Sequence, residues 1–173
     1  ETDLNIYIPK NQTDLDKNQF PVMFWIHGGS NIWGSGDFYD FSKLATTQQV
    51  IVVTINYRLG LFGWFSSEHL RNTATGLDKS SNFGQLDLIK GLEWVQENIS
   101  AFGGDKDNIT IFGESAGGHN VLTLLASPLS EGLFHKAISQ SGYVSSYTQK
   151  FAEEESELSL SLIHISEPTR HTR

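Results

Sequence analysis

The sequence contains no cysteine, which excludes a disulfide framework, a thiolate nucleophile and a cysteine-based metal site together. No apolar run approaches the roughly 20 residues that a membrane-spanning helix requires, so we expect no membrane span. Positive charge is scarce, because 12 Lys and Arg stand against 20 Asp and Glu for a net charge of −8. No basic cluster offsets this balance, and nucleic acid is not an expected partner. The first residues lack a basic and apolar leader, so any targeting signal would lie outside the chain.

The length of 173 residues is enough for one domain with one hydrophobic core. The composition changes near the C-terminus, since all 16 glycines lie at or before Gly142. We therefore interpret residues 4–150 as the folded domain. Residues 151–159 are rich in glutamate, and we expect them to be a native, solvated and helix-prone segment.

The last 14 residues, 160–173, resemble the translated adaptor of a sequencing library. We expect this tail to be non-native, with a genuine strand-like tail as the alternative. On the adaptor interpretation, His164 and His171 are not candidates for catalysis.

Short runs of β-branched and aromatic residues alternate with helical patterns, which indicates an α/β sheet with crossover helices. The patterns predict strands over 4–8, 21–26, 50–55, 109–112 and 136–139, and helices over 41–49, 83–99 and 115–126. The second and third strands are almost continuously apolar, so we expect them at the centre of the sheet with both faces covered. The helix between these two strands predicts a right-handed crossover.

A G-x-S-x-G motif, Gly113-Glu114-Ser115-Ala116-Gly117, stands directly between a predicted strand and a predicted helix. This context is the one in which the motif forms a strained turn that exposes the serine hydroxyl. Such a turn is too tight for side chains two residues before and two residues after the serine, and Gly113 and Gly117 fill those positions. The N-terminus of the following helix favours negative charge at the serine.

A glycine-containing loop, Trp25-Ile26-His27-Gly28-Gly29-Ser30, follows another predicted buried strand. Small residues let backbone N–H groups approach a substrate carbonyl closely, as an oxyanion hole requires. The complementary donor would be the N–H of Ala116, directly after the serine. A plain strand-ending turn is the alternative when the loop is considered alone.

From about Leu4 to Gly142 the chain resembles type-B carboxylesterases, the cholinesterase-like branch of the α/β-hydrolase family. The serine signature is similar from Phe102-Gly103-Gly104 to Gly117, and further matching blocks are Leu4-Asn5-Ile6-Tyr7, Asn56-Tyr57-Arg58-Leu59-Gly60, Trp94-Val95-Gln96-Glu97-Asn98-Ile99 and Gly132-Leu133-Phe134. The resemblance implies an α/β-hydrolase-type sheet with crossover helices. It also implies a serine hydrolase that cleaves carboxylic esters.

By this resemblance, Ser115 is the nucleophile that accepts the acyl group. The implied oxyanion donors are the N–H groups of Gly29, Ser30 and Ala116, and Gly28 gives the loop its conformation. Ser30 departs from the family, which usually has a third glycine there, and its side chain would narrow substrate acceptance.

An attacking serine needs a general base, normally a histidine held by a carboxylate. In the family that the chain resembles, each later triad partner follows on the order of a hundred residues further on, whereas this chain ends at Arg173, 58 residues after Ser115. The resemblance thus implies a truncated domain that lacks the C-terminal part of the fold, with its acid and histidine. We expect the chain alone to be inactive.

The histidines near the motif are weak substitutes for that base. We expect His119 to have a packing or polar structural role, since it lies on the helix while the serine hydroxyl points away from it. His135 is expected at the surface, and His27 is expected to hold the oxyanion loop by a hydrogen bond. His69 is predicted to lie in a loop, where it could contact a pocket.

Other candidate site residues are acidic or aromatic. Glu114 resembles a family position where an acidic residue lines the site. Asp87, within a predicted helix with apolar neighbours, is expected to be a buried, hydrogen-bonded carboxylate. Trp33, Phe38 and Tyr39 follow the oxyanion loop and could form a wall beside the acyl group, with simple loop packing as the alternative.

Neither a metal nor another cofactor is expected. The histidines lack metal-ligand spacing, and no phosphate-binding glycine fingerprint is present. The expected partner is a small-molecule ester. A non-catalytic adhesion or recognition protein and an amidase or acyltransferase using the same serine are the alternatives. The oligomeric state stays open, and the resemblance is compatible with an extracellular or periplasmic location.

Overall fold

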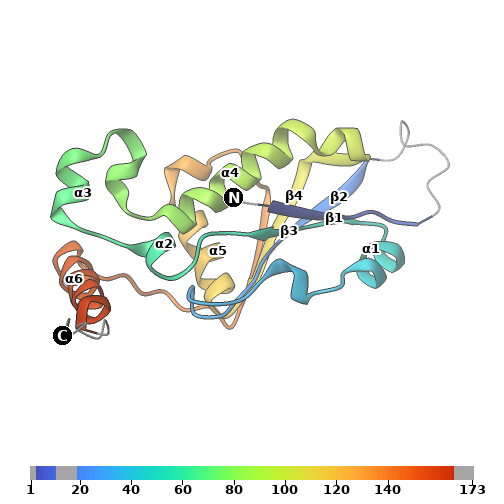
Figure 1. Ribbon diagram of the computed structural model, residues 1–173. Coiled ribbons are helices and arrows are strands. Elements are labelled where there is room, and N and C mark those ends of the chain that lie inside the picture. The colour runs from blue at the N-terminus through green and yellow to red at the C-terminus, as the bar shows by residue number, and fades with distance from the viewer. Residues whose placement is uncertain (1–2, 11–18, 166–173) are drawn as a thin grey trace, which may run out of the picture.

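The computed structural model describes residues 3–10 and 19–165, and within this part of the chain it shows one five-stranded sheet (Figure 1). The strand order is β1-β3-β2-β4-β5. The strands are β1 (Asp3–Tyr7), β2 (Phe20–Ile26), β3 (Ile51–Asn56), β4 (Gly104–Glu114) and β5 (Lys136–Gln140). β1 pairs with β3 antiparallel, and the other neighbours are parallel. The two apolar strands, β2 and β3, lie inside the sheet as expected.

Helices cover both faces of these strands. On one face α4 (Phe83–Asn98) and α5 (Ala116–Ala126) contribute to the larger core cluster, and on the other α1 (Ser42–Gln48) contributes Ala45 to a smaller aromatic cluster around Trp25 (Figure 1). Successive residues of β2 alternate between the two clusters, since Phe24 and Ile26 join the larger one and Trp25 the smaller one. This alternation explains why β2 is almost continuously apolar.

The element boundaries agree with the predicted ones within one or two residues, except at β4. This strand begins at Gly104 and not at residue 109. Its first part contains Asp105, Lys106 and Asp107 and lacks the apolar pattern that marks the buried part. The chain pairs there only briefly, at Gly104 opposite Phe20.

Two short helices were not predicted, α2 (Gly60–Trp64) and α3 (Glu68–Thr73). The expectation that His69 lies in a loop is therefore wrong, because it lies exposed on α3. The Ser67 side chain caps this helix by accepting a hydrogen bond from the backbone N–H of Leu70 at 3.1 Å. A serine cap before a short polar helix leaves little hydrophobic periodicity for a sequence pattern to detect.

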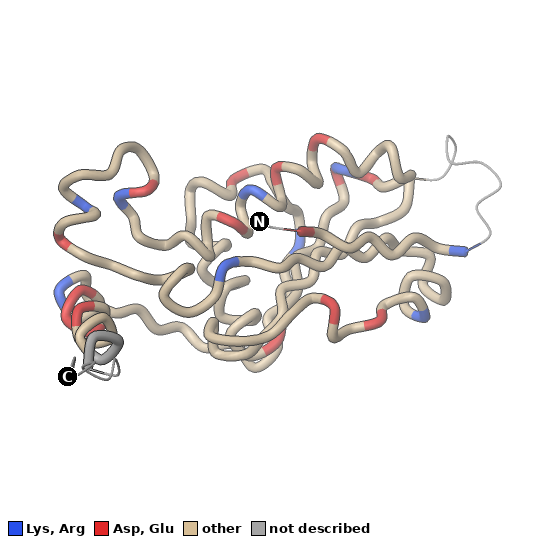
Figure 2. The backbone as a smooth tube through the Cα atoms, in the orientation of Figure 1, with Lys and Arg blue, Asp and Glu red and all other residues tan. Residues whose placement is uncertain are grey.

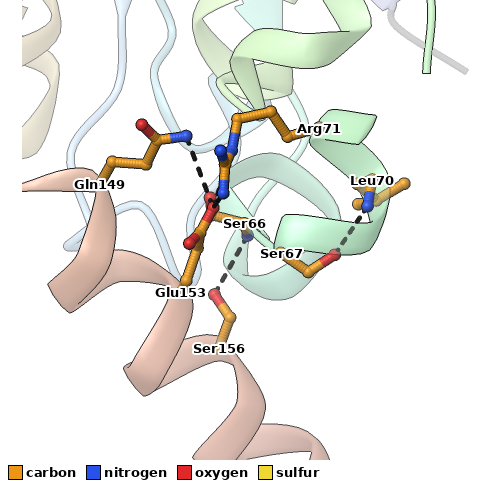
Figure 3. A network of polar contacts seen from close by, with 7 residues as sticks. All are labelled: Ser66, Ser67, Leu70, Arg71, Gln149, Glu153 and Ser156. Atoms are coloured by element: carbon orange, nitrogen blue, oxygen red, sulfur yellow. Dashed lines mark hydrogen bonds and ion pairs between the residues drawn. The ribbon is translucent and has the colours of Figure 1, made fainter. Parts of the chain in front are cut away.

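The glutamate-rich segment forms most of α6 (Gln149–Ile165), which lies beside α3 (Figure 3). Glu153 accepts hydrogen bonds from Nε and an Nη of Arg71 at 3.0 and 2.7 Å, and Ser156 accepts one from the backbone N–H of Ser66 at 3.1 Å. α6 continues into the tail that resembles an adaptor, and residues 166–173 of that tail lie outside the described residues. The adaptor interpretation stays a prediction.

The charged residues lie mainly on helices and loops (Figure 2). Lys and Arg are spread singly along the described chain, whereas acidic residues gather on α6 (Figure 2). No described helix has the length and hydropathy needed to cross a membrane.

Asp87 of α4 is buried as expected and accepts three hydrogen bonds from Arg58, at 2.8 to 2.9 Å.

Candidate active site

Ser115 lies at the sharp turn between β4 and α5, and its backbone has φ 54° and ψ −119°. This is a left-handed φ that a residue with a side chain adopts only at a conformational cost. The turn leaves no room for side chains at its two glycines. A Cβ on Gly117 would lie 2.0 Å from the carbonyl oxygen of Ile26, and one on Gly113 would lie 2.5 Å from the carbonyl carbon of Gly117. The backbone N–H of Ser115 donates to the carbonyl of Gln140 in β5 at 2.9 Å.

The loop after β2 lies directly against this turn. A Cβ on Gly28 would meet the carbonyl oxygen of Glu114 at 2.9 Å and the Cβ of Ser115 at 3.3 Å. Gly29 has φ 103°, and a Cβ there would lie 2.0 Å from the carbonyl oxygen of Trp33. Gly28 is required because the loop contacts the serine turn there, and Gly29 is required because the loop folds back on itself at a left-handed φ.

His27 is 1% exposed and holds the start of this loop. Its Nδ1 donates to the carbonyl of Gly28 at 2.7 Å, which is the hydrogen bond expected from the sequence. Its ring stacks on Tyr57 with the centroids 4.4 Å apart, and the Tyr57 hydroxyl donates to the His27 carbonyl at 2.6 Å. Burial lowers the pKa of His27 and raises the pKa of Tyr57. Burial thus favours the neutral over the charged imidazole, and the phenol stays protonated, as its donation to the His27 carbonyl requires.

Sequence reasoning missed the contribution of Tyr57. Its position directly after β3 was the available signal, because parallel β2 and β3 end at the same edge of the sheet. A residue directly after β3 therefore lies close to the loop after β2.

A cavity of about 290 Å³ opens between the loop and the serine turn. It is lined by His27, Gly28, Gly29, Ser30, Trp33, Gly34, Ser35, Phe38, Tyr39, Glu114 and Ser115. The aromatic side chains of Trp33 and Phe38 are 66% and 70% exposed. The structure thus brings most predicted site residues together around one cavity. Gly113, Ala116 and Gly117 are buried in the adjacent turn.

The remaining described histidines make contacts other than with Ser115. Nδ1 of His119 is hydrogen-bonded to the carbonyl of Tyr143 at 2.5 Å, and its ring stacks on that of Tyr143. His135 is exposed, and its Nδ1 accepts from the backbone N–H of Ile109 at 3.1 Å. In the part of the chain that the structure describes, no histidine is hydrogen-bonded to the serine hydroxyl. Within the same residues, no group of three or more His, Asp or Glu could hold a metal ion.

Comparison with known proteins gives one consistent result. The model of the carboxylesterase family matches residues 3–161. Carboxylesterase 1E of Rattus norvegicus is 50% identical over 141 residues, which are 80% of this chain and 23% of the rat protein. Para-nitrobenzyl esterase of Bacillus subtilis is 47% identical over 166 residues, which are 95% of this chain and 32% of the bacterial protein. The chain thus spans less than a third of the length of these curated relatives.

Solved structures agree with the sequence comparison. A thermophilic pNB esterase superposes with a TM-score of 0.83 at 43% identity, over 94% of this chain and 32% of that one. The carboxylesterase EST55 of Geobacillus stearothermophilus gives a TM-score of 0.82 at 43% identity, over 92% of this chain and 33% of that one.

Proposed function

The chain belongs to the carboxylesterase family and has the α/β-hydrolase fold, and from this premise we propose that its full-length protein hydrolyses carboxylic esters with Ser115 as nucleophile. The observation that carries the proposal is the position of Ser115. It lies at a left-handed turn before α5, on the wall of a cavity that the glycine loop also lines. A serine and a glycine loop that line one cavity support acyl transfer, which requires a nucleophile close to backbone N–H donors.

In the proposed reaction, Ser115 Oγ attacks the ester carbon, and the carbonyl oxygen becomes an oxyanion. The N–H groups of Gly29, Ser30 and Ala116 hold this oxyanion, and the N-terminus of α5 adds a favourable field. The base takes the hydroxyl proton and gives it to the departing alcohol, which leaves an acyl group on Ser115. Water, activated by the same base, then releases the acid and restores the serine.

The base and its carboxylate lie outside this chain in our proposal. His27 is buried and bonded to its own loop, while His119 is bonded to Tyr143. Because the chain spans only 23–32% of its relatives, the rest of the protein has ample length to supply both groups. The 173 residues alone should retain only the small rate that binding and the oxyanion donors provide.

A fluorophosphonate probe, which labels activated serines, tests the proposal on the full-length protein. We expect labelling and ester hydrolysis in the parent protein, and loss of both in Ser115→Ala. Ser159→Ala is the matched control, since this half-buried serine on α6 only donates to the carbonyl of Glu155 at 2.9 Å. Labelling that persists in Ser115→Ala, or a folded parent protein that neither reacts with the probe nor hydrolyses esters, would refute the proposal.

A further inference from the structure

The loop that carries the proposed oxyanion donors has an unusual backbone. Three consecutive residues have positive φ, with 103° at Gly29, 56° at Ser30 and 58° at Asn31. Glycine adopts such angles freely, but Ser30 and Asn31 pay a conformational cost for them. Other contacts must therefore hold this segment in place.

The contacts that hold it converge on Asn31. Its backbone carbonyl accepts from the N–H of Gly60 at 2.6 Å, and its side-chain Oδ1 accepts from Nδ2 of Asn120 at 2.9 Å. Inside the loop, the carbonyl of Gly29 accepts from the N–H groups of Ile32 and Trp33 at 3.0 and 3.1 Å. Among these contacts, the bond to Asn120 ties the loop to the helix that follows the serine.

Asn120 is a rigid partner for this bond. It lies on α5, is 1% exposed, and its backbone carbonyl accepts from Nε2 of Gln85 on α4 at 3.3 Å. It is four residues, about one helical turn, after Ala116. Asn31 in turn directly follows Ser30. One hydrogen bond between side chains 89 positions apart thus connects the two halves of the proposed oxyanion hole.

We infer that Asn31 and Asn120 are positioning residues, whose mutual hydrogen bond holds the N–H of Ser30 in register with the N–H of Ala116. This inference rests on the proposed function, since it gives the bond a role in the same reaction. Neither side chain touches the reacting atoms. Each acts through the loop or the helix that carries an oxyanion donor.

The test uses two substitutions at one position in the full-length protein. Asn31→Gly relieves the backbone at φ 58° but removes the side-chain acceptor, so the protein should fold with a loosened loop. Asn31→Asp keeps an acceptor oxygen and tolerates the same backbone angle. Because losing a whole oxyanion donor costs about 10²- to 10³-fold in kcat, a loosened donor in Asn31→Gly should cost about tenfold, with KM almost unchanged. Asn31→Asp keeps the acceptor but adds a negative charge near the proposed oxyanion, so it should lose less kcat than Asn31→Gly without reaching the parent.

A transition-state analogue separates positioning from general damage. A trifluoromethyl ketone, which forms a tetrahedral adduct with the serine, should bind Asn31→Gly about tenfold more weakly, in step with kcat. Asn120→Ala should lower kcat at least as much as Asn31→Gly, and the double variant should be no worse than Asn120→Ala alone, because both substitutions remove the bond between the two side chains. Asn98→Ala is the control: its Nδ2 donates to the carbonyl of Trp94 at 2.8 Å, at the end of α4, and its loss should leave kcat unchanged.

The outcomes separate the two proposals. If the full-length protein and its Ser115→Ala variant are equally inactive, the proposed function fails and this inference falls with it. If the full-length protein is active and Asn31→Gly keeps its kcat, or if Asn31→Asp loses as much as Asn31→Gly, only this inference is overturned. Multiplying effects in the double variant would also overturn it.

Discussion

Two tight turns meet at the cavity, and different forces hold them. At the serine turn, Ser115 is held at φ 54° by backbone packing, because Gly113 and Gly117 bring the chain against the carbonyl of Ile26. In the loop after β2, Ser30 and Asn31 have similar φ values of 56° and 58°. There the constraint comes mainly from polar contacts, such as the bond between Asn31 and Asn120.

The difference shows how one site can combine two kinds of strain. Packing against a central strand cannot be lost without disturbing the sheet. Substitutions in the serine turn should therefore first lower the stability of the protein. Single hydrogen bonds contribute modestly to stability. Substitutions that remove a hydrogen bond of the loop should therefore lower the catalytic activity more than the stability.

The largest expected effect is that of Gly117→Ala. The new Cβ would lie 2.0 Å from the carbonyl oxygen of Ile26, so we expect a loss of more than about 4 kcal/mol in the free energy of unfolding, or no folded protein. Gly132→Ala is the control, since it also adds a Cβ, at φ 78°, but has nothing within 4 Å of it. It should cost only about 1–2 kcal/mol. Equal losses in chemical denaturation would show that packing does not constrain the turn.

The next effect concerns His27, which belongs to the loop but is buried. His27→Phe keeps an aromatic ring beside Tyr57 and removes the hydrogen bond to Gly28, so we expect about 1–2 kcal/mol less stability at pH 7.5. Urea unfolding measures this loss. A substitution without effect would mean that the loop does not need this bond.

The same variant should change the pH dependence of stability. Burial lowers the pKa of His27 from 6.5 in the folded protein. The unfolded chain therefore binds more protons below about pH 6.5, and the free energy of unfolding falls there by up to about 1.4 kcal/mol per pH unit. His27→Phe should show a weaker acid dependence of the free energy of unfolding between pH 7 and 5 than the parent protein. Identical pH profiles for the two proteins would contradict this assignment.

The smallest expected effect is at the aromatic rim of the cavity. Trp33 and Phe38 are 66% and 70% exposed, so replacing either with Ala should change the free energy of unfolding by no more than about 0.5 kcal/mol. Both line the cavity beside Ser115. KM for esters with large apolar groups should rise about fivefold, corresponding to about 1 kcal/mol of lost burial, while KM for acetate esters stays the same. A uniform change for all esters would exclude the rim as a selectivity element.

The sequence predicted the sheet well, because continuous apolar runs mark the central strands and glycines mark the tight turns. The prediction failed for segments that are short or consist mainly of polar residues. The helix that carries His69 has a serine cap and no buried residue, so no periodicity identifies it. Most of β4 before Ile109 is likewise charged and partly solvated.

The site was predictable in parts and not as a whole. Ser115 and the glycine loop lie next to strand ends, where local sequence is informative. The bond between Asn31 and Asn120 joins two positions 89 residues apart. Asparagine is common in loops and on helices, so neither residue pointed to the other in the sequence. Tyr57 became significant only when its hydroxyl was found to donate to the carbonyl of His27.

The hydrogen bond from the N–H of Ser115 to the carbonyl of Gln140 in β5 has a consequence for protein synthesis. A nascent chain to which Ser115 has just been added still lacks β5, whose carbonyl accepts this hydrogen bond. At about 5–20 residues per second, the ribosome adds that strand within a few seconds. Until β5 pairs with β4, packing against the end of β2 holds the serine turn without the hydrogen bond at the N–H of Ser115.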